Sequence, residues 1–498
     1  MKINNIINQI SDATNYREKF SLQSARQDGT LGPFVGKYLM YECVHTVFEK
    51  YKHTIPSIRC IVATHVLADG LGDYYHAVNA INTLKVNFPH WDYTFIVQFA
   101  NSNIKKETLT LPDTGDGNIL FINEENKNSA ITKIEESDLI INIPLSLNIL
   151  TDNADKTKVL KVSEYGNPGF TAMGVGPSSW GVVVGNISKG SIHDIQDSEV
   201  LTLLTGFGSP SNEQIDKYRE STDRFFGYIK TSFKSSIAYF YSSVTYARGS
   251  SKDVDIFLPF DSDDAEQQFS LAMDIDFLKS HGIGSLEIVE KNGNIINQIN
   301  VGEGKKARWL NVFPIKQNEV HYLMQDSAPL TGCSGDMSIG EAISAGKDFF
   351  YEGRSHKSKF VSQLINLAEK NTDANSALVQ YLKIQKNLYA LIESYLPENS
   401  SFEIIREEAE KLAQIACTDP FKEQMKDFRQ LILDNFNFNS KLSSLAFRHY
   451  YGIHHVDFLK LQEDIAQPLG KKKIEEFSVS QHLKDSCNRI DAYVKQFL

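Results

Sequence analysis

The chain has 498 residues, 41% of them hydrophobic and 23% charged, and a formal net charge of -11. This length exceeds what one hydrophobic core supports, so we expect two α/β domains with helical additions. The negative charge argues against broad binding to nucleic acid, and no window approaches the ~18 apolar residues that a membrane span needs.

The cysteines and the N-terminus indicate the compartment. The five cysteines are scattered without a CxxC pair, which predicts reduced thiols. The N-terminus lacks the apolar stretch of a secretory signal. We therefore expect a cytoplasmic protein, with export by a non-classical route as an alternative.

The first half of the chain reads as a helical extension followed by a Rossmann-like domain. Residues 1–55 are polar with helical spacing, and we assign 56–235 to the N-terminal domain. A strand at 58–66, a helix from Tyr74 to about Phe88 and a strand at 93–99 form one βαβ unit. Further strands are expected at 118–122, 138–143, 157–162 and 180–185.

A second alternating series begins near Ser236, and we assign 236–355 to a C-terminal Rossmann-like domain. Its strands are predicted at 237–241, 254–258, 286–289 and 308–313, with a helix at 263–280. From His356 to the end, apolar residues recur at helical spacing, which predicts a helical C-terminal region at 356–498.

The first motif that can carry chemistry is the strand-to-helix turn at 69–73. Gly70 and Gly72 allow close approach of a ligand, and the helix that follows attracts anions. A dinucleotide fingerprint needs a third glycine where Tyr75 stands. A tight turn with acidic helix capping is the alternative without a ligand.

The turn resembles the start of the heptosyltransferases, in which a GxGD-like loop precedes a helix that ends in an LK…P pattern, here Leu84, Lys85 and Pro89. In that family and in the protein-arginine rhamnosyltransferases, an acidic residue of this loop is the catalytic base. The resemblance implies Asp73 as the base, with Asp69 as its substitute. His65 is a further alternative.

The second motif spans 330–352 and reads strand, glycine-containing loop, short helix, strand. Unpaired N–H groups at the helix start can hold a pyrophosphate, which nominates Gly335, Asp336, Met337 and Ser338. Glu341, one turn further, can accept hydrogen bonds from ribose hydroxyls. The alternative is a capping box formed by Ser338 and Glu341 that needs no ligand.

This motif resembles the donor-site signature of GT-B glycosyltransferases, among them the lipid-linked peptidoglycan GlcNAc-transferases, whose glutamate binds ribose. Gly346-Lys347 matches the GK of that signature, and Pro314, Gln317 and Leu323 precede it in the order of the rhamnosyltransferases. His356 and Lys357 follow where related families place a polar contact to the nucleotide-sugar. The resemblance implies a GT-B fold, with two Rossmann-like parallel-sheet domains facing a cleft.

Arg248 and two D-x-D triplets are further candidates for binding a diphosphate or a metal. Arg248 follows the expected first strand of the second domain, where a guanidinium suits two phosphate oxygens. The D-x-D triplets at 253–255 and 274–276 are expected on a strand and a helix, which does not suit a metal site. We therefore expect no metal and no cofactor beyond the nucleotide-sugar, which is a substrate.

These expectations combine into a metal-independent glycosyltransferase that moves a sugar from a nucleotide-sugar donor to a protein, glycan or lipid-linked acceptor. No nucleic-acid partner and no transmembrane segment are expected. One alternative is a non-hydrolysing nucleotide-sugar epimerase, whose His-Arg-Arg-Glu-Asn-like stretch we do not find. The other is a non-catalytic interaction protein built on the same fold.

Overall fold

The structure is a computed structural model. It describes residues 44–66, 71–100, 109–112, 114, 118–123, 125–143, 147–163, 165, 173–175, 179–195, 198–229, 232–260, 269, 273–394, 398–451, 488, 491–492 and 494–496. Most of the expected extension at 1–55 lies outside these residues, as do Asp69 and Gly70. The described chain forms two compact units. One contains the residues up to Val183, except Leu109 and Thr110, together with those from Leu431 on, and the other contains Val184–Gln430.

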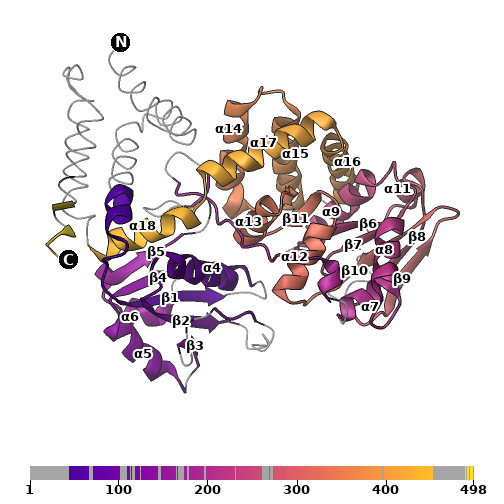
Figure 1. Cartoon of the computed structure of the whole chain (residues 1–498). Coiled ribbons are helices and arrows are strands. Elements are labelled where there is room, and N and C mark those ends of the chain that lie inside the picture. The colour runs from indigo at the N-terminus through magenta and orange to yellow at the C-terminus, as the bar shows by residue number, and fades with distance from the viewer. Residues whose placement is uncertain are drawn as a thin grey trace, which may run out of the picture. The chain divides into compact units, whose positions relative to one another are not determined.

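The first unit is built on a five-stranded parallel sheet of order β3-β2-β1-β4-β5 (Figure 1). Its strands are β1 (Arg59–Val66), β2 (Asp92–Phe99), β3 (Ile119–Phe121), β4 (Leu139–Asn142) and β5 (Val159–Lys161). The connecting helices are α4 (Gly72–Asn87), α5 (Lys127–Glu136) and α6 (Asn148–Asn153). Each of the strands predicted between 58 and 162 is therefore present, with bounds shifted by a few residues.

The two faces of this sheet bury different cores because side chains alternate along each strand. Ile61, Ala63 and Ile140 pack on α5 and α6. The residues between them point to the opposite face, where Tyr74 of α4 lies 5.5 Å from the Phe95 ring. Both faces are apolar, as expected for a parallel sheet that is covered on both sides.

The C-terminal end of the described chain returns to this unit. Helix α18 (Asn439–Tyr450) packs on α4, where Asn87 Nδ2 donates to Ser443 Oγ at 2.9 Å. Just before α18, the Val182 N–H donates to the Phe436 carbonyl at 2.6 Å, and the Phe438 N–H donates to the Val182 carbonyl at 2.8 Å. The expected strand at 180–185 is reduced to isolated bridges of this kind.

The second unit is built on a seven-stranded sheet of order β12-β11-β6-β7-β10-β8-β9, parallel except for β9. Its strands are β6 (Thr222–Tyr228), β7 (Asp253–Phe257), β8 (Ile283–Val289), β9 (Ile295–Asn300), β10 (Lys305–Leu310), β11 (Leu330–Cys333) and β12 (Asp348–Tyr351). Its connecting helices are α9 (Phe233–Tyr246), α11 (Ile275–Ser280), α12 (Gln317–Asp326) and α13 (Asp336–Ser344).

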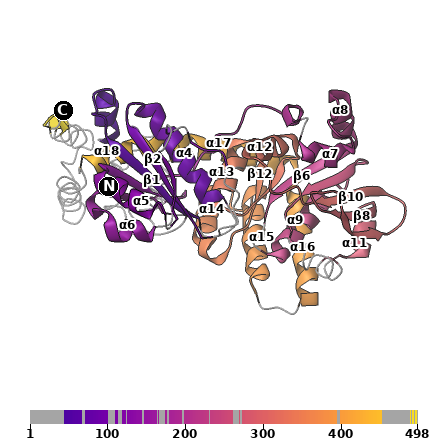
Figure 2. The same cartoon turned by 90° about the horizontal axis from the view of Figure 1, so that it is seen from below.

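Helices cover both faces of the second sheet (Figures 1 and 2). One face packs against η3 (Ile192–Ile195), α7 (Glu199–Thr205), α8 (Asn212–Ser221) and α12. The other packs against α9, which is itself covered by α15 (Ala377–Ile392) and α16 (Glu398–Ala416). Trp309 of β10 is fully buried on this side, with its ring 5.4 Å from Phe240 of α9.

The strand predicted at 237–241 is a helix in the structure, and this error displaced the expected domain boundary. Residues 237–241 lie in α9, and the first strand of the second sheet is β6, in a region where we expected a break. Helix α9 is enclosed by the sheet and by other helices, so almost every side chain from Ser235 to Thr245 is buried and the run lacks an amphipathic pattern. The second unit accordingly begins after Val183, not near residue 235.

The region after residue 356 is helical as predicted wherever the structure describes it, but it does not form one separate layer. Helices α14 (Ser358–Asn371), α15 and α16 belong to the second unit, and the division between units falls within α17 (Asp419–Asn435). In the described part of the chain, no helix combines the length and apolar character required for a membrane span. The predicted α/β class is confirmed, with two Rossmann-like sheets and added helices.

Candidate functional site

Helix α13 begins at the position where an open parallel sheet binds ligands. The chain order reverses between the adjacent strands β6 and β11, and ligands of such sheets bind at the carboxyl ends of the strands at this switch point. Gly332 of β11 pairs with Gly227 of β6. Strand β11 then ends at Cys333, and α13 starts three residues later.

The N-terminus of α13 is capped differently from the expectation. Gly335 is the N-cap, its N–H donates to Ser338 Oγ at 2.9 Å, and Ser338 Oγ donates to the Gly335 carbonyl at 3.0 Å. Ser338 is thus the third helical residue, and the capping box of Ser338 and Glu341, the alternative that needs no ligand, does not form. A side chain at Gly335 would meet nothing closer than Ser338 Oγ at 4.0 Å, so the space beside this N-terminus is open.

The first turn of α13 carries an ion pair. Asp336 lies in that turn, followed by Met337, and Lys357 Nζ lies 2.9 Å from Asp336 Oδ1. Lys357 reaches it from η4 (Ser355–Lys357), which follows the carboxyl end of β12, and both side chains are largely buried. His356, in the same turn, is exposed. Asp336, Lys357 and the α13 amides therefore lie at one edge of the sheet.

Glu341 lies inside a polar cluster with residues that the motif did not include. Its Oε1 accepts hydrogen bonds from Gln317 Nε2 at 2.5 Å and from His321 Nε2 at 3.2 Å. The Ser188 backbone N–H donates to His321 Nδ1 at 3.0 Å, with Ser188 Oγ at 2.9 Å. Because a backbone N–H only donates, Nδ1 is the acceptor and the ring proton resides on Nε2, facing the carboxylate.

The second oxygen of the Glu341 carboxylate, Oε2, takes no part in the polar cluster. Oε2 has no hydrogen-bond partner among the described residues, although the residue is only 6% exposed. The segment at Gly185 lies against this side chain, since a Cβ at Gly185 would be 2.8 Å from Glu341 Cγ. Glu341 is therefore held in one orientation with a single free acceptor, and it is not openly exposed.

Burial, and secondarily the nearby Glu341 charge, raises the pKa of the Cys333 thiol well above its ordinary value. Cys333 is fully buried, and its Sγ donates weakly to the Ser338 carbonyl at 3.5 Å. A protonated, buried thiol is not a nucleophile. Cys333 is therefore a packing residue of this edge.

Two predicted contributors lie at the opposite edge of the sheet. Arg248 follows the end of α9, beside the amino end of β7, and does not meet the start of α13. Lys347 of the GK pair precedes β12, and its Nζ donates to the Gln325 and Ser327 carbonyls. Burial lowers the pKa of Lys347 to about 8. The expectation that Arg248 and the start of α13 bind one diphosphate together is thus wrong. Lys347 instead stabilises the C-terminal end of α12.

In the first unit, Asp73 occupies the first turn of α4 beside the carboxyl end of β1. It is half-buried, and Thr64 Oγ1 of β1 donates to its carbonyl at 3.4 Å. Gly72 begins this helix, while Asp69 and Gly70 lie outside the described residues. The position of Asp73 agrees with the expected strand–turn–helix, and its role as a base stays a prediction.

A buried amide lies at the switch point of the first sheet, between β1 and β4. Asn142 is 1% exposed, and neither its Oδ1 nor its Nδ2 has a hydrogen-bond partner among the residues that the structure describes. It pairs in register with Ala63, so His65 lies two residues further on the same face, opposite Gln98 of β2. Burial lowers the pKa of His65. An unpaired buried amide costs about 1–3 kcal/mol, which a bound hydroxyl or amide can offset.

In each D-x-D triplet, at least one carboxylate is held by protein partners. Arg308 contacts both Asp255 oxygens, at 2.7 and 2.6 Å, and Tyr218 donates to Oδ2 at 2.6 Å. Asp274 caps α11 by accepting from the Phe277 N–H, and it pairs with Arg406. The described residues contain no cluster of three or more potential metal ligands.

Three residues of these edges escaped the sequence analysis: Ser188, His321 and Asn142. A signal existed for Asn142, which interrupts the apolar strand Leu139–Asn142, and for His321, which is four residues after Gln317 and so on the same helix face. Ser188 comes from an irregular segment with no pattern that marks it.

No protein-family model matches the chain, and no curated protein matches it in sequence. Among solved structures, it is similar to an α-glucosyltransferase in complex with UDP and a 13-mer DNA containing an HMU base. The two are 11% identical, the match covers 75% of this chain and 100% of that chain, and the TM-score is 0.31. A TM-score this low carries no argument, so the fold rests on the two sheets and the function on the geometry of their edges.

Proposed function

We propose that the protein is a glycosyltransferase that binds a nucleotide-sugar at the carboxyl edge of its second sheet. The observation that carries the proposal is the free Glu341 Oε2 one turn from the open N-terminus of α13. An acceptor of hydroxyl protons and a group of phosphate-binding amides at this spacing match the ribose and diphosphate of a nucleoside diphosphate. The resemblance of 330–352 to the donor-site signature supports the same assignment.

In this proposal the diphosphate is held by the backbone N–H groups of Asp336, Met337 and Ser338 and by the Lys357 ammonium. The Asp336 carboxylate repels a diphosphate, so it must exchange its pairing with Lys357 for an arrangement in which the lysine contacts both. The positive end of the helix and the lysine then stabilise the charge that develops on the leaving diphosphate. No metal ion is required for that stabilisation.

The acceptor in this proposal binds at the carboxyl edge of the first sheet. The Asn142 amide offers one acceptor and two N–H donors, which suits the hydroxyl groups of a sugar or of another hydroxyl-bearing acceptor. Asp73 is the proposed base, and His65 remains the alternative on β1. A base in this position takes the proton of the attacking hydroxyl as the bond to the sugar forms.

The proposal is tested with nucleoside diphosphates and the Glu341→Gln variant. In this variant the remaining Oε1 still accepts from Gln317 and His321, while an NH₂ group replaces Oε2. We expect one of UDP, GDP, ADP or dTDP to stabilise the wild type, by about 2.7 kcal/mol at 100 times its Kd. The variant should bind the same nucleotide about tenfold or more weakly, because it loses a hydrogen bond to a charged acceptor.

The matched control is Glu287→Gln, which makes the same change on strand β8 of the same sheet, at a carboxylate paired with Lys306 at 2.6 Å. It should leave nucleotide affinity unchanged. Equal affinity in wild type and Glu341→Gln would remove Glu341 from the site, and absence of binding by all four nucleotides would refute the proposed function.

A further inference from the structure

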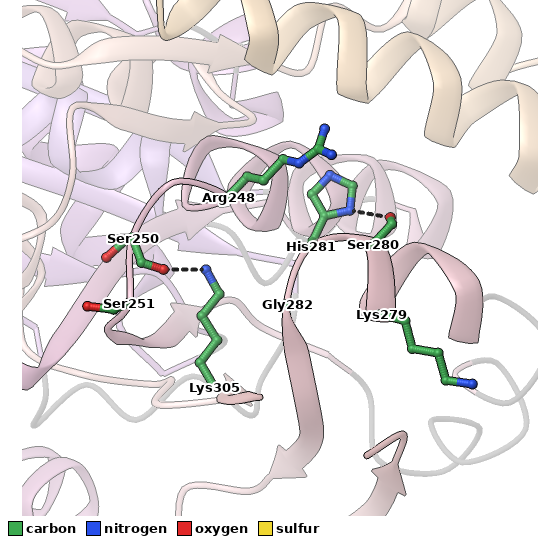
Figure 3. Close-up of a pocket in the computed structure, with 8 residues that line it drawn as sticks. All are labelled: Arg248, Ser250, Ser251, Lys279, Ser280, His281, Gly282 and Lys305. Atoms are coloured by element: carbon green, nitrogen blue, oxygen red, sulfur yellow. Dashed lines mark hydrogen bonds between the residues drawn. The ribbon is translucent and has the colours of Figure 1, made fainter. Parts of the chain in front are cut away.

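A pocket lies at the amino edge of the second sheet, opposite the edge at which α13 begins. It has a volume of about 440 Å³, within the range of small-molecule sites. The end of α9, the end of α11 and the starts of β7, β8 and β10 enclose it. Figure 3 shows the side chains that line it: Lys305 points toward Ser250, the Arg248 guanidinium lies near the His281 ring, and Lys279 extends away from them.

The lining of this pocket is cationic in a protein of net charge -11. Arg248, Lys279 and Lys305 contribute three positive charges, Ser250, Ser251 and Ser280 contribute hydroxyl groups, and none of the lining residues is acidic. Within the described chain, neither Arg248 nor Lys279 forms an ion pair, whereas Lys306 and Arg308 of β10 each pair with a carboxylate. Two cations are therefore available to an anion from solution.

Lys305 differs from the other two cations because the fold uses it. Its Nζ donates to the carbonyls of Ala247 and Ser250 at 2.6 and 3.1 Å, where it closes the end of α9. Asp223 and Asp253 offset part of its charge, and burial lowers its pKa. Lys305 thus fixes the loop that carries Arg248 and the two serines.

The one imidazole of the lining is also fixed. His281 Nδ1 donates to the Phe277 carbonyl at 2.8 Å, and its ring packs 4.1 Å from the Phe277 ring. Burial lowers its pKa, with Arg248 and Lys305 acting in the same direction. His281 therefore forms part of the pocket wall, and Arg248 and Lys279 are the exposed cations that an anion can contact.

We propose that this pocket binds a phosphate-bearing small molecule, separately from the nucleotide-sugar site. Guanidinium and ammonium donors with adjacent hydroxyls are the groups that coordinate phosphate oxygens. The volume exceeds that of one phosphate ion, so the occupant carries further polar atoms, as a sugar phosphate does. The lining offers no flat apolar surface for a base, which favours a sugar phosphate over a nucleotide.

The test is calorimetric titration of the full chain with a hexose 6-phosphate and with inorganic phosphate. We expect the wild type to bind the hexose phosphate, and Arg248→Ala/Lys279→Ala to bind it at least about tenfold more weakly, as expected from the loss of charge-assisted hydrogen bonds. Both substituted residues are exposed and unpaired, so the fold should be unaffected, which a thermal unfolding curve checks. Lys305 is left unchanged because it caps α9.

Two control variants locate the binding. Lys252→Ala removes an exposed charge near the pocket that does not line it, and it should bind as the wild type does. Glu341→Gln alters the other edge of the sheet and should also keep full affinity for the hexose phosphate. The proposal is overturned if the wild type binds neither probe, if the double variant binds as the wild type does, or if Lys252→Ala weakens binding equally.

Discussion

The carboxyl edges of the two sheets lie at equivalent topological positions and differ in how their buried polar groups are satisfied. In the second unit, Ser188, His321 and Gln317 form a hydrogen-bonded set around Glu341, and Asp336 pairs with Lys357. In the first unit, Asn142 is buried, and neither amide atom has a hydrogen-bond partner in the described part of the chain. At the edge of the second sheet, Glu341 Oε2 and the buried Thr331 Oγ1 of β11 lack hydrogen-bond partners among the described residues, whereas at the edge of the first sheet a whole side chain lacks them.

This difference indicates what each edge does in the proposed reaction. A network whose members hold one another in place is preorganised, so it binds a ligand of fixed shape at little reorganisation cost. A nucleoside diphosphate is such a ligand. An unpaired amide lowers stability until a ligand supplies its partners, which suits binding of the acceptor. The changes below test the two assignments, starting with the largest expected effect.

The largest effect is expected for Asp73→Asn in the first unit. The variant keeps the shape of the side chain but cannot take a proton from the acceptor. Sugar transfer should fall by ~10²–10⁴, while the affinity for the nucleoside diphosphate stays at the wild-type value. Transfer rates and equilibrium binding are measured on the same preparation. Near-normal turnover would remove Asp73 as the base and leave Asp69 or His65 as the candidate.

A smaller effect is expected for Asn142→Leu, and it is an increase in stability. Leucine has a similar size and no polar atoms, so it removes the penalty of the unpaired amide. The free energy of unfolding should rise by about 1–3 kcal/mol in a denaturant titration, while sugar transfer falls because the acceptor loses its contacts.

Asn87→Leu is the matched control in the same unit, because Asn87 donates to Ser443 Oγ at 2.9 Å. It should lower the free energy of unfolding by about 0.5–1.5 kcal/mol. A loss of stability in Asn142→Leu as large as in Asn87→Leu would show that the Asn142 amide is satisfied in solution, and the contrast between the two edges would disappear.

The sequence predicted most of the fold because strands buried on both faces leave continuous apolar runs. The runs at 58–66 and 93–99 are of this kind, and both are strands in the structure. The same signal misassigned 237–241, since a helix enclosed on all sides is also continuously apolar. Strand β6 was missed because it opens with Thr222, Asp223 and Arg224, three polar residues, and the domain boundary was displaced with it.

The sequence predicted the start of α13 but not the residues that form hydrogen bonds with Glu341. The motif at 330–352 correctly predicted a helix N-terminus after a strand. The hydrogen bonds of Glu341 depend on Ser188 and His321, which are distant in the chain and which only the tertiary fold brings together. Arg248 was misplaced for a related reason, because a strand at 237–241 would have put it at the carboxyl edge, whereas a helix carries it to the amino edge.

The central claim is that the nucleotide binds at the start of α13, and amide hydrogen exchange tests it most directly. The exchange of the full chain is compared with and without the nucleoside diphosphate that gives the largest thermal stabilisation. The account predicts slower exchange of the amides at 334–341, which contact the diphosphate, and unchanged exchange at 246–252. Protection at 246–252 with none at 334–341 would contradict it and place the nucleotide in the cationic pocket at the opposite edge.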